Sequence, residues 1–238
     1  MMKVLVTSGA TREPIDSVRF ISNISTGKTG AVITDELTRM GVEVHLVCGQ
    51  ESVRPKAEVK LTEFSHFHDL DRILRYELAS FKYDAVIHAA AVSDYSVINP
   101  HQGKISSDQA MLSIQLTRNF KIVEKLKDYS RNSCEIQVIA FKLTDTLNQQ
   151  ERMQAIQKLS THPKIDYVVH NDLVEIKTTG THTFAIFSKN QKVSQGETKS
   201  EMAEKLFALM TQSRETSSRE KEDSNLKNQK GSTHDSRS

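Results

Sequence analysis

The strongest constraint on the fold is the regular alternation of short apolar runs with segments of helical periodicity. Residues 4–6 and 84–92 are mostly apolar, and residues 42–47 form a further run in which apolar and polar residues alternate. Between them, residues 28–41 carry apolar side chains at helical spacing and end in Gly41, a residue typical of helix C-termini. Apolar strands separated by helices favour a parallel sheet that is covered on both faces.

The same alternation continues along the chain. It predicts strands at residues 59–64, 110–116, 135–141 and 165–169, helices at 65–81, after Asn119, at 147–159 and around 202–209, and a hairpin at 183–193. Residues 94–108 are polar, contain Pro100 and Gly103, and predict a long loop. We therefore expect an α/β fold: a Rossmann-like, doubly wound, mostly parallel sheet with helices on both faces and a C-terminal β-hairpin.

The composition predicts one domain followed by a tail. The 238 residues suffice for a single α/β domain with a sizeable core, and 37% of them are apolar. From about residue 213, serines and interleaved charges dominate, and Leu226 is the only bulky apolar residue. Such a segment buries too little apolar surface to offset the entropy that ordering costs. We expect a folded domain at residues 1–212 and a disordered polar tail at residues 213–238.

Composition also disfavours several classes of protein. No apolar run is long enough to span a bilayer, so we expect no membrane association. The first residues lack a signal-peptide layout, which favours a cytoplasmic location. The net charge of +2 comes without a clustered basic face, so nucleic acid is not an expected partner. Two cysteines, Cys48 and Cys134, are too few for a disulfide framework, and no His or Cys spacing predicts a metal site.

The opening stretch, residues 4–30, combines a strand, a glycine-bearing loop and the start of a helix. Backbone amides and the helix dipole at such a place favour an anionic ligand. Gly27-Lys28-Thr29 resembles the end of a P-loop, but Ser22 stands where that motif requires its first glycine. A dinucleotide-binding GxGxxG is also incomplete. A less common phosphate or carboxylate site remains, with side-chain donors at Thr11, Arg12, Arg19 and Lys28.

Three further polar residues are candidates for a functional role, although each also has an ordinary structural explanation. Asp94 follows a predicted central strand, where ligands of open α/β sheets bind, but an aspartate there also caps turns. Asn23 could donate its amide to an oxyanion or form an Asx turn. Lys104 lies in the polar loop, where a lysine alone is most often a solvated surface charge.

The motifs together resemble a known family, the phosphopantothenoylcysteine synthetases (phosphopantothenate–cysteine ligases), in their stand-alone form within the DNA/pantothenate metabolism flavoproteins. The resemblance covers about residues 3–210. It is carried by residues 7–16, 18–23 and 25–30, by Ala89-Ala90-Ala91-Val92-Ser93-Asp94-Tyr95, by Lys104, by Phe141-Lys142-Leu143 and by Asn171-Asp172.

The resemblance implies a ligase of coenzyme A biosynthesis. Such an enzyme activates the carboxylate of 4'-phosphopantothenate as an acyl-nucleotidylate, releases pyrophosphate, and lets the cysteine amine attack the mixed anhydride. CTP, favoured over ATP, would be the co-substrate, with Mg²⁺ to neutralise the crowded anions. The resemblance also implies a homodimer, no bound flavin, and a separate flavin-dependent decarboxylase as a pathway neighbour.

Carried over by motif, Asn23 and Lys104 would be the catalytic residues. Asn23 would hold the activated carbonyl or the pantothenate group, and Lys104 would stabilise the charge of the intermediate from a closing loop. The implied nucleotide-binding residues are Gly9, His88, Ala89, Ala90, Asp94, Lys104, Arg118, Asn119, Phe120, Lys121, Phe141, Lys158 and Lys164. Pro163 departs from the family spacing, because it should end the helix between Lys158 and Lys164.

Two other functions remain open on the residues alone. The α/β sheet could belong to a reductase that uses NADPH or a flavin, although the incomplete GxGxxG counts against it. The chain could also be a non-catalytic nucleotide-binding module, in which Lys104 would have no turnover to support.

Overall fold

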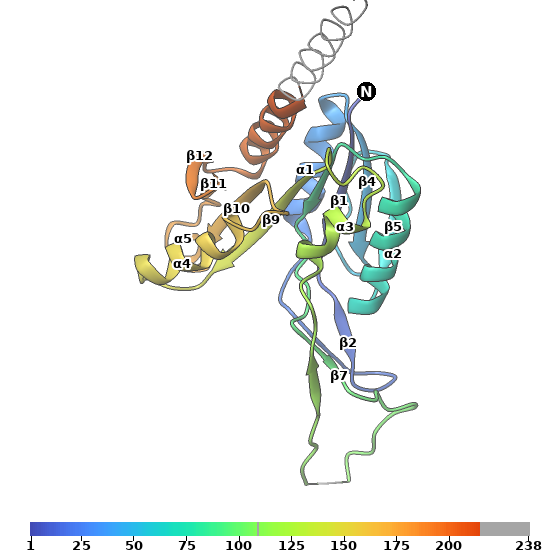
Figure 1. Cartoon of the computed structure of the whole chain (residues 1–238). Coiled ribbons are helices and arrows are strands. Elements are labelled where there is room, and N and C mark those ends of the chain that lie inside the picture. The colour runs from blue at the N-terminus through green and yellow to red at the C-terminus, as the bar shows by residue number, and fades with distance from the viewer. Residues whose placement is uncertain (109, 215–238) are drawn as a thin grey trace, which may run out of the picture.

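The computed structural model describes residues 1–108 and 110–214 (Figure 1). Its centre is an eight-stranded sheet with the order β12-β11-β10-β9-β6-β1-β4-β5. The strands are β1 (Lys3–Ser8), β4 (Glu43–Gly49), β5 (Lys60–Phe64), β6 (Ala85–His88), β9 (Gln137–Thr144), β10 (Tyr167–Asp172), β11 (Phe184–Ser188) and β12 (Gln191–Gly196). The strands from β5 to β10 are parallel, and the β11–β12 hairpin extends the sheet antiparallel to them. The predicted doubly wound sheet and its hairpin are confirmed.

The chain order reverses beside β1, which pairs with β4 on one side and with β6 on the other. From β1 the chain moves outward to β4 and β5, then crosses back to β6 and continues to β9 and β10. Connections that leave two neighbouring strands in opposite directions open a crevice at the carboxyl ends of those strands. The crevice therefore lies where Ser8 ends β1 and His88 ends β6.

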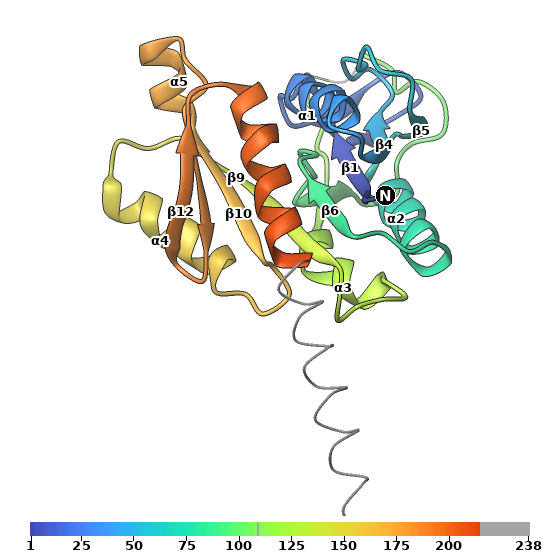
Figure 2. The same ribbon diagram turned by 90° about the horizontal axis from the view of Figure 1, so that it is seen from above.

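Helices cover both faces of the sheet (Figure 2). On one face, α1 (Lys28–Arg39) and the C-terminal helix at residues 199–214 pack Ile33, Leu37 and Leu206 against the strands. The second face carries a separate buried cluster, to which Leu74 and Leu126 belong. Its helices are α2 (Phe67–Ser80), the 3-10 helix η1 (Ile122–Lys125), α3 (Leu126–Tyr129) and α4 (Gln149–Ser160). A short α5 (Leu173–Thr179) follows β10.

An arm extends below the sheet in Figure 1, away from the helical layers. It contains two small antiparallel pairs, β2 (Arg12–Pro14) with β3 (Phe20–Ser22), and β7 (Tyr95–Val97) with β8 (Leu116–Arg118). The prediction of a strand at residues 110–116 is wrong, because regular pairing begins only at Leu116. The apolar side chains of Met111 and Leu112 are exposed, so the apolar residues of this segment do not pack on a buried sheet face.

The C-terminal helix continues past the predicted domain boundary at 212/213. Ser213 and Arg214 are still helical, and the hydroxyl of Ser213 donates to the carbonyl of Leu209 at 3.0 Å. Residues 215–238 of the predicted tail lie outside the described residues. Within the described part, no helix is both long enough and apolar enough to cross a bilayer.

Candidate active site

Two adjoining cavities occupy the crevice at the carboxyl ends of the parallel strands. The first, here called the loop cavity, has a volume of about 410 Å³ and is lined mainly by residues 23–30, 89–92 and 141–143. The second, the strand-end cavity, has a volume of about 350 Å³ and is lined mainly by residues 88–94, 120–124 and 140–142 with Lys158. Six residues line both: Ala90, Val92, Asp94, Lys121, Phe141 and Lys142. A ligand could therefore extend from one cavity into the other.

Glycines shape the loop at the start of α1. Gly27 precedes the helix at φ 74°, a conformation that L side chains rarely adopt, and the hydroxyl of Ser8 donates to its carbonyl at 2.8 Å. A Cβ at Gly30 would lie 2.4 Å from Ser8 Oγ, so only glycine lets α1 approach β1 this closely. The helix begins without a side-chain cap and without an acidic residue in its first turn. The amide of Lys28 makes only a long hydrogen bond, 3.4 Å, to the hydroxyl of Thr26, so the first turn of the helix can still donate to an anionic ligand in the loop cavity.

Asn23 and Lys28, which are predicted to bind the substrate, both lie on the wall of the loop cavity. The side-chain amide of Asn23 donates to the carbonyl of Val92 at 3.2 Å, which links the opening loop to the loop after β6. Both residues therefore face the same space as Ala89 and Ala90.

Aromatic and basic side chains characterise the strand-end cavity. Phe120 is partly exposed and packs edge-on against Phe67, with 5.0 Å between the ring centroids. Lys158 on α4 and Phe141 on β9 complete the wall. The ammonium of Lys121 pairs with the carboxylate of Asp94. An aromatic ring could pack between these side chains, so the cavity suits a nucleotide base better than the loop cavity does.

His88 ends β6 at the floor of this cavity, with 7% of its side chain exposed. Its Nδ1 lies 2.9 Å from the hydroxyl of Thr7, and burial lowers the pKa of the imidazole to about 4. The same hydroxyl accepts a hydrogen bond from the amide of Ala90. His88 is therefore neutral at pH 7 and links β1 to the loop that carries Ala89 and Ala90.

The structure does not bring Lys104 to either cavity. Lys104 lies on the arm between Gly103, whose carbonyl accepts from the amide of Ser17, and Ile105, whose amide donates to Asp16. That Lys104 stabilises the charge of the acyl-nucleotidylate intermediate therefore stays a prediction. It would require the loop that carries Lys104 to move toward the cavities. Lys164 also lies outside both cavities and pairs with Asp128 at 2.7 Å. As Pro163 predicted, α4 has already ended at Ser160.

Five other candidates lie on the arm or in the loops at the ends of the central strands. The hydroxyl of Thr11 donates to Ser93, and the guanidinium of Arg12 stacks on Phe20 at 4.6 Å. The amide of Asn119 donates to the carbonyl of Ser93 at 3.0 Å. Arg118 is exposed on β8, and Gly9 abuts the backbone of Gly27 from the end of β1. None of these side chains lines the cavities, so their predicted ligand contacts remain predictions.

Arg19 is part of an ion pair on the arm. Its guanidinium pairs with Asp16 at 2.8 Å and donates to the carbonyl of Ile105 at 2.6 Å. Burial favours the neutral acid, but hydrogen bonds from Val18, Ile105 and Arg19 hold the pKa of Asp16 well below its usual range. The predicted phosphate donor Arg19 is thus occupied within the arm.

Sequence reasoning missed several residues of the loop cavity, chiefly Lys142 and His182, and gave Asn171 no role there. Asn171 ends β10, which lies beside β9 and its Lys142. Lys142 and Asn171 share one feature that could have predicted them, because both lie near the carboxyl end of a parallel strand. To predict that these two strand ends are neighbours, however, one must know the order of the strands in the sheet. His182 lies in the loop between α5 and β11, a position that no sequence period marks.

The residues present do not form a cage for Mg²⁺. Asp94 and Glu124 are the carboxylates that line the strand-end cavity, and Asp94 pairs with Lys121. Within the described residues, no three side chains of His, Cys, Asp or Glu gather as a metal site. Mg²⁺ is commonly held by substrate phosphates with one or two carboxylates. A Mg²⁺ ion at this cavity would therefore have to be held mainly by the phosphates of a bound nucleotide.

Comparison with known proteins agrees with the fold. The bifunctional coenzyme A biosynthesis protein CoaBC of Thermococcus kodakarensis is 33% identical over 205 residues, which are 86% of this chain and 50% of that protein. The chain thus spans about half the length of the curated relatives it matches. The crystal structure of a DNA/pantothenate metabolism flavoprotein from Streptococcus pneumoniae has a TM-score of 0.77 at 30% identity, covering 89% of this chain and 99% of that one.

A Cab2 variant in complex with phosphopantothenate-cysteine shares the fold, with a TM-score of 0.70 at 16% identity over 91% of this chain and 89% of that one. The family described as the DNA/pantothenate metabolism flavoprotein C-terminal domain matches residues 1–213. This match covers the whole sheet and both cavities. The chain therefore belongs to the DNA/pantothenate metabolism flavoprotein C-terminal domain family.

Proposed function

We propose that this chain acts in coenzyme A biosynthesis, as the names of its CoaBC relatives suggest, and that it joins 4'-phosphopantothenate to cysteine. The reaction would pass through an acyl-nucleotidylate with release of pyrophosphate, and CTP would be favoured over ATP. The observation that carries the proposal is the pair of adjoining cavities that share Asp94, Lys121 and Phe141. A reaction that transfers a nucleotidyl group to a carboxylate requires such adjacent sites.

The chemistry requires one cavity for each anion. A carboxylate is a poor electrophile, and a nucleotidyl leaving group makes its carbonyl susceptible to an amine. Asn23 and the first amides of α1 would orient the acid in the loop cavity, and Phe120, Phe141 and Lys158 would hold the nucleotide in the strand-end cavity. Lys121, paired with Asp94 between the two, is placed to neutralise charge where the acid meets the nucleotide.

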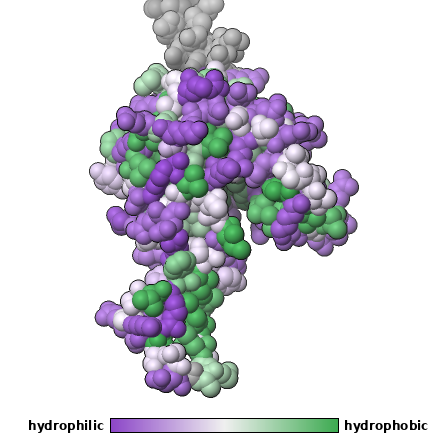
Figure 3. Space-filling model, turned by 180° about the vertical axis from the view of Figure 1, so that it is seen from behind, coloured by the Kyte–Doolittle hydropathy of each residue, from purple (hydrophilic) through white to green (hydrophobic). Residues whose placement is uncertain are grey.

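We also propose a cytoplasmic homodimer, with the arm as the surface that joins the two copies. The support is the set of exposed apolar side chains that gather on the arm, since contiguous exposed apolar patches often mark protein–protein interfaces (Figure 3). It comprises Val18, Phe20, Ile21, Ile98, Met111, Leu112, Ile114 and Leu116.

A nucleotide panel in a pyrophosphate-release assay tests the proposed function. With phosphopantothenate and cysteine present, CTP should release pyrophosphate faster than ATP, GTP or UTP, and the amide product should appear in equal amount. Omitting phosphopantothenate should abolish the release. No release with any nucleotide would contradict the ligase, and equal release without the acid would indicate a plain hydrolase.

A further inference from the structure

Three basic side chains gather at one side of the loop cavity without a balancing carboxylate. Lys28 and His182 line the cavity. Lys199, the first residue of the C-terminal helix, is not part of the lining but is close enough to both side chains to interact with them electrostatically. Among the described residues, none of the three side chains forms an ion pair or a hydrogen bond. The Nδ1 atom of His182 is buried and has no partner. Burial, then the charges of Lys199 and Lys28, lower the pKa of His182, and burial and Lys28 lower that of Lys199.

This arrangement is unfavourable for the folded chain by itself. Both lysines occupy the first position of a helix, where the positive end of the helix dipole disfavours a cation. The two ammonium groups also repel each other, and both disfavour the protonated form of His182. A lysine with only a solvated surface role would avoid these costs, as Lys205 does one and a half turns along the same helix, near Glu201. Like charges held together near a cavity indicate a site for an anion.

We propose that Lys199 and His182, together with Lys28, bind the phosphate monoester of the acid substrate and make the loop cavity selective for a phosphorylated acid. The proposal rests on the proposed function and names two residues that sequence reasoning gave no role. A phosphate monoester carries nearly two negative charges at pH 7, which offset the repulsion between the two lysines and favour the protonated, hydrogen-bond-donating form of His182. The phosphates of a nucleotide are the other source of this chemistry. We favour the monoester because neither Lys28 nor His182 lines the strand-end cavity, where the base would lie.

The test compares phosphopantothenate with unphosphorylated pantothenate, and it compares the KM for the acid with the KM for the nucleotide. For Lys199→Met and His182→Gln we expect the KM for phosphopantothenate to rise about ten- to a hundredfold, the effect of losing one hydrogen bond to a charged group. The KM for the nucleotide should change less than twofold. The preference for phosphopantothenate over unphosphorylated pantothenate should fall by the same factor as the KM rises. Lys199→Arg, which keeps the charge, should retain most of the affinity, and the matched control Lys205→Met should behave as the wild type.

A second measurement does not depend on turnover. Without ligand, Lys199→Met should have a Tm at least as high as the wild type, because the substitution removes a partly buried charge and its repulsion from Lys28. Calorimetric titration with phosphopantothenate alone should show weaker binding to Lys199→Met than to Lys205→Met.

Two results would overturn the inference: an unchanged affinity for phosphopantothenate, or a rise in KM for the nucleotide only, which would assign the bases to the nucleotide phosphates. Absence of turnover by the wild type would instead contradict the proposed function, and the titration would still decide where the phosphate binds.

Discussion

At the scale of single residues, a substitution of Asn23 is expected to separate the two proposed half-reactions. Its amide reaches across the loop cavity to Val92 and has no part in the buried core. We expect Asn23→Ala to leave the free energy of unfolding within about 0.5 kcal/mol of the wild type, as is usual for exposed substitutions. The variant should still release pyrophosphate in a first turnover but form amide at least tenfold more slowly. Rapid-quench measurement of both products checks this, and an unchanged overall rate would refute the role.

His88 makes stability depend on pH. Its pKa is about 4 in the folded protein and about 6.5 in the unfolded chain, so the unfolded chain binds more protons between these values. Stability should therefore fall as the pH falls, by about 2 kcal/mol between pH 7 and pH 5 from this group alone. Denaturant titrations should show a smaller loss for His88→Gln than for the wild type. The exposed His68→Gln is the control, and an equal loss in both variants would contradict the assignment.

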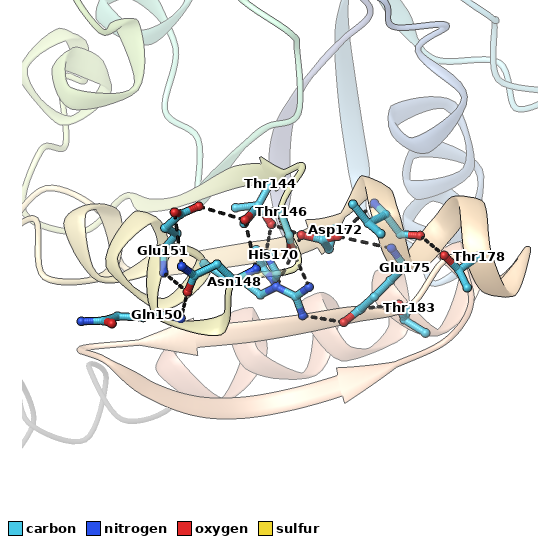
Figure 4. Close-up of polar contacts among 12 residues, drawn as sticks. Thr144, Thr146, Asn148, Gln150, Glu151, His170, Asp172, Glu175, Thr178 and Thr183 are labelled. Carbon is cyan, nitrogen blue, oxygen red and sulfur yellow. Dashed lines mark hydrogen bonds and ion pairs between the residues drawn. The ribbon is translucent and has the colours of Figure 1, made fainter.

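At the scale of elements, one polar network connects the ends of β9 and β10 with α4 and α5 (Figure 4). Asp172 is fully buried, accepts from the amide of Val174 at 2.9 Å to cap α5, and receives the hydroxyl of Thr144. The guanidinium of Arg152 lies 3.4 Å from this carboxylate and also pairs with Glu175. The network therefore places α5 and the end of β10, where Asn171 faces the loop cavity.

Asp172→Ala should lower the free energy of unfolding by about 3 kcal/mol, because it removes the cap and leaves Arg152 with less compensation. Asp172→Asn keeps hydrogen-bonding atoms at the cap and should lose less. Chemical denaturation of the three proteins measures both changes. Equal stability of Asp172→Ala and the wild type would show that the network has no structural role.

The elements also show which parts of the fold the sequence could predict. β1, β4, β6, β9 and β10 pack into the core, so their apolar runs were sufficient signals. By contrast, β2, β3, β7 and β8 have three residues each and pair on the arm, and α5 has no buried residue. Strands of three residues, and a helix with no buried side chain, leave no apolar period in the sequence. At the site, Asn23, Asp94 and Phe141 belong to motifs that can be recognised in the sequence. His182 belongs to no such motif, and only the tertiary structure places it at the loop cavity.

At the scale of the whole molecule, the arm is the feature that a single copy does not explain. Its pairs are held by Asn119, Thr11 and Asp16, but Met111 and Ile114 remain exposed along it. An apolar arm that projects from the body suits burial against a second copy, and obligate homodimer interfaces are enriched in such residues. Lys104 lies on the same arm, so the assembly would also determine how that lysine approaches a cavity.

We expect the wild type to sediment as a dimer at micromolar concentration and Met111→Glu/Ile114→Glu to sediment as a monomer. Charges at these positions would have to be desolvated in the interface, whereas in a free arm they remain in water and leave the Tm nearly unchanged. Leu147→Glu, at an exposed apolar position on the distant side of the sheet beside α4, is the matched control and should remain dimeric. A monomeric wild type would contradict the proposed homodimer. A dimeric double variant with an unchanged dissociation constant would place the interface elsewhere than on the arm.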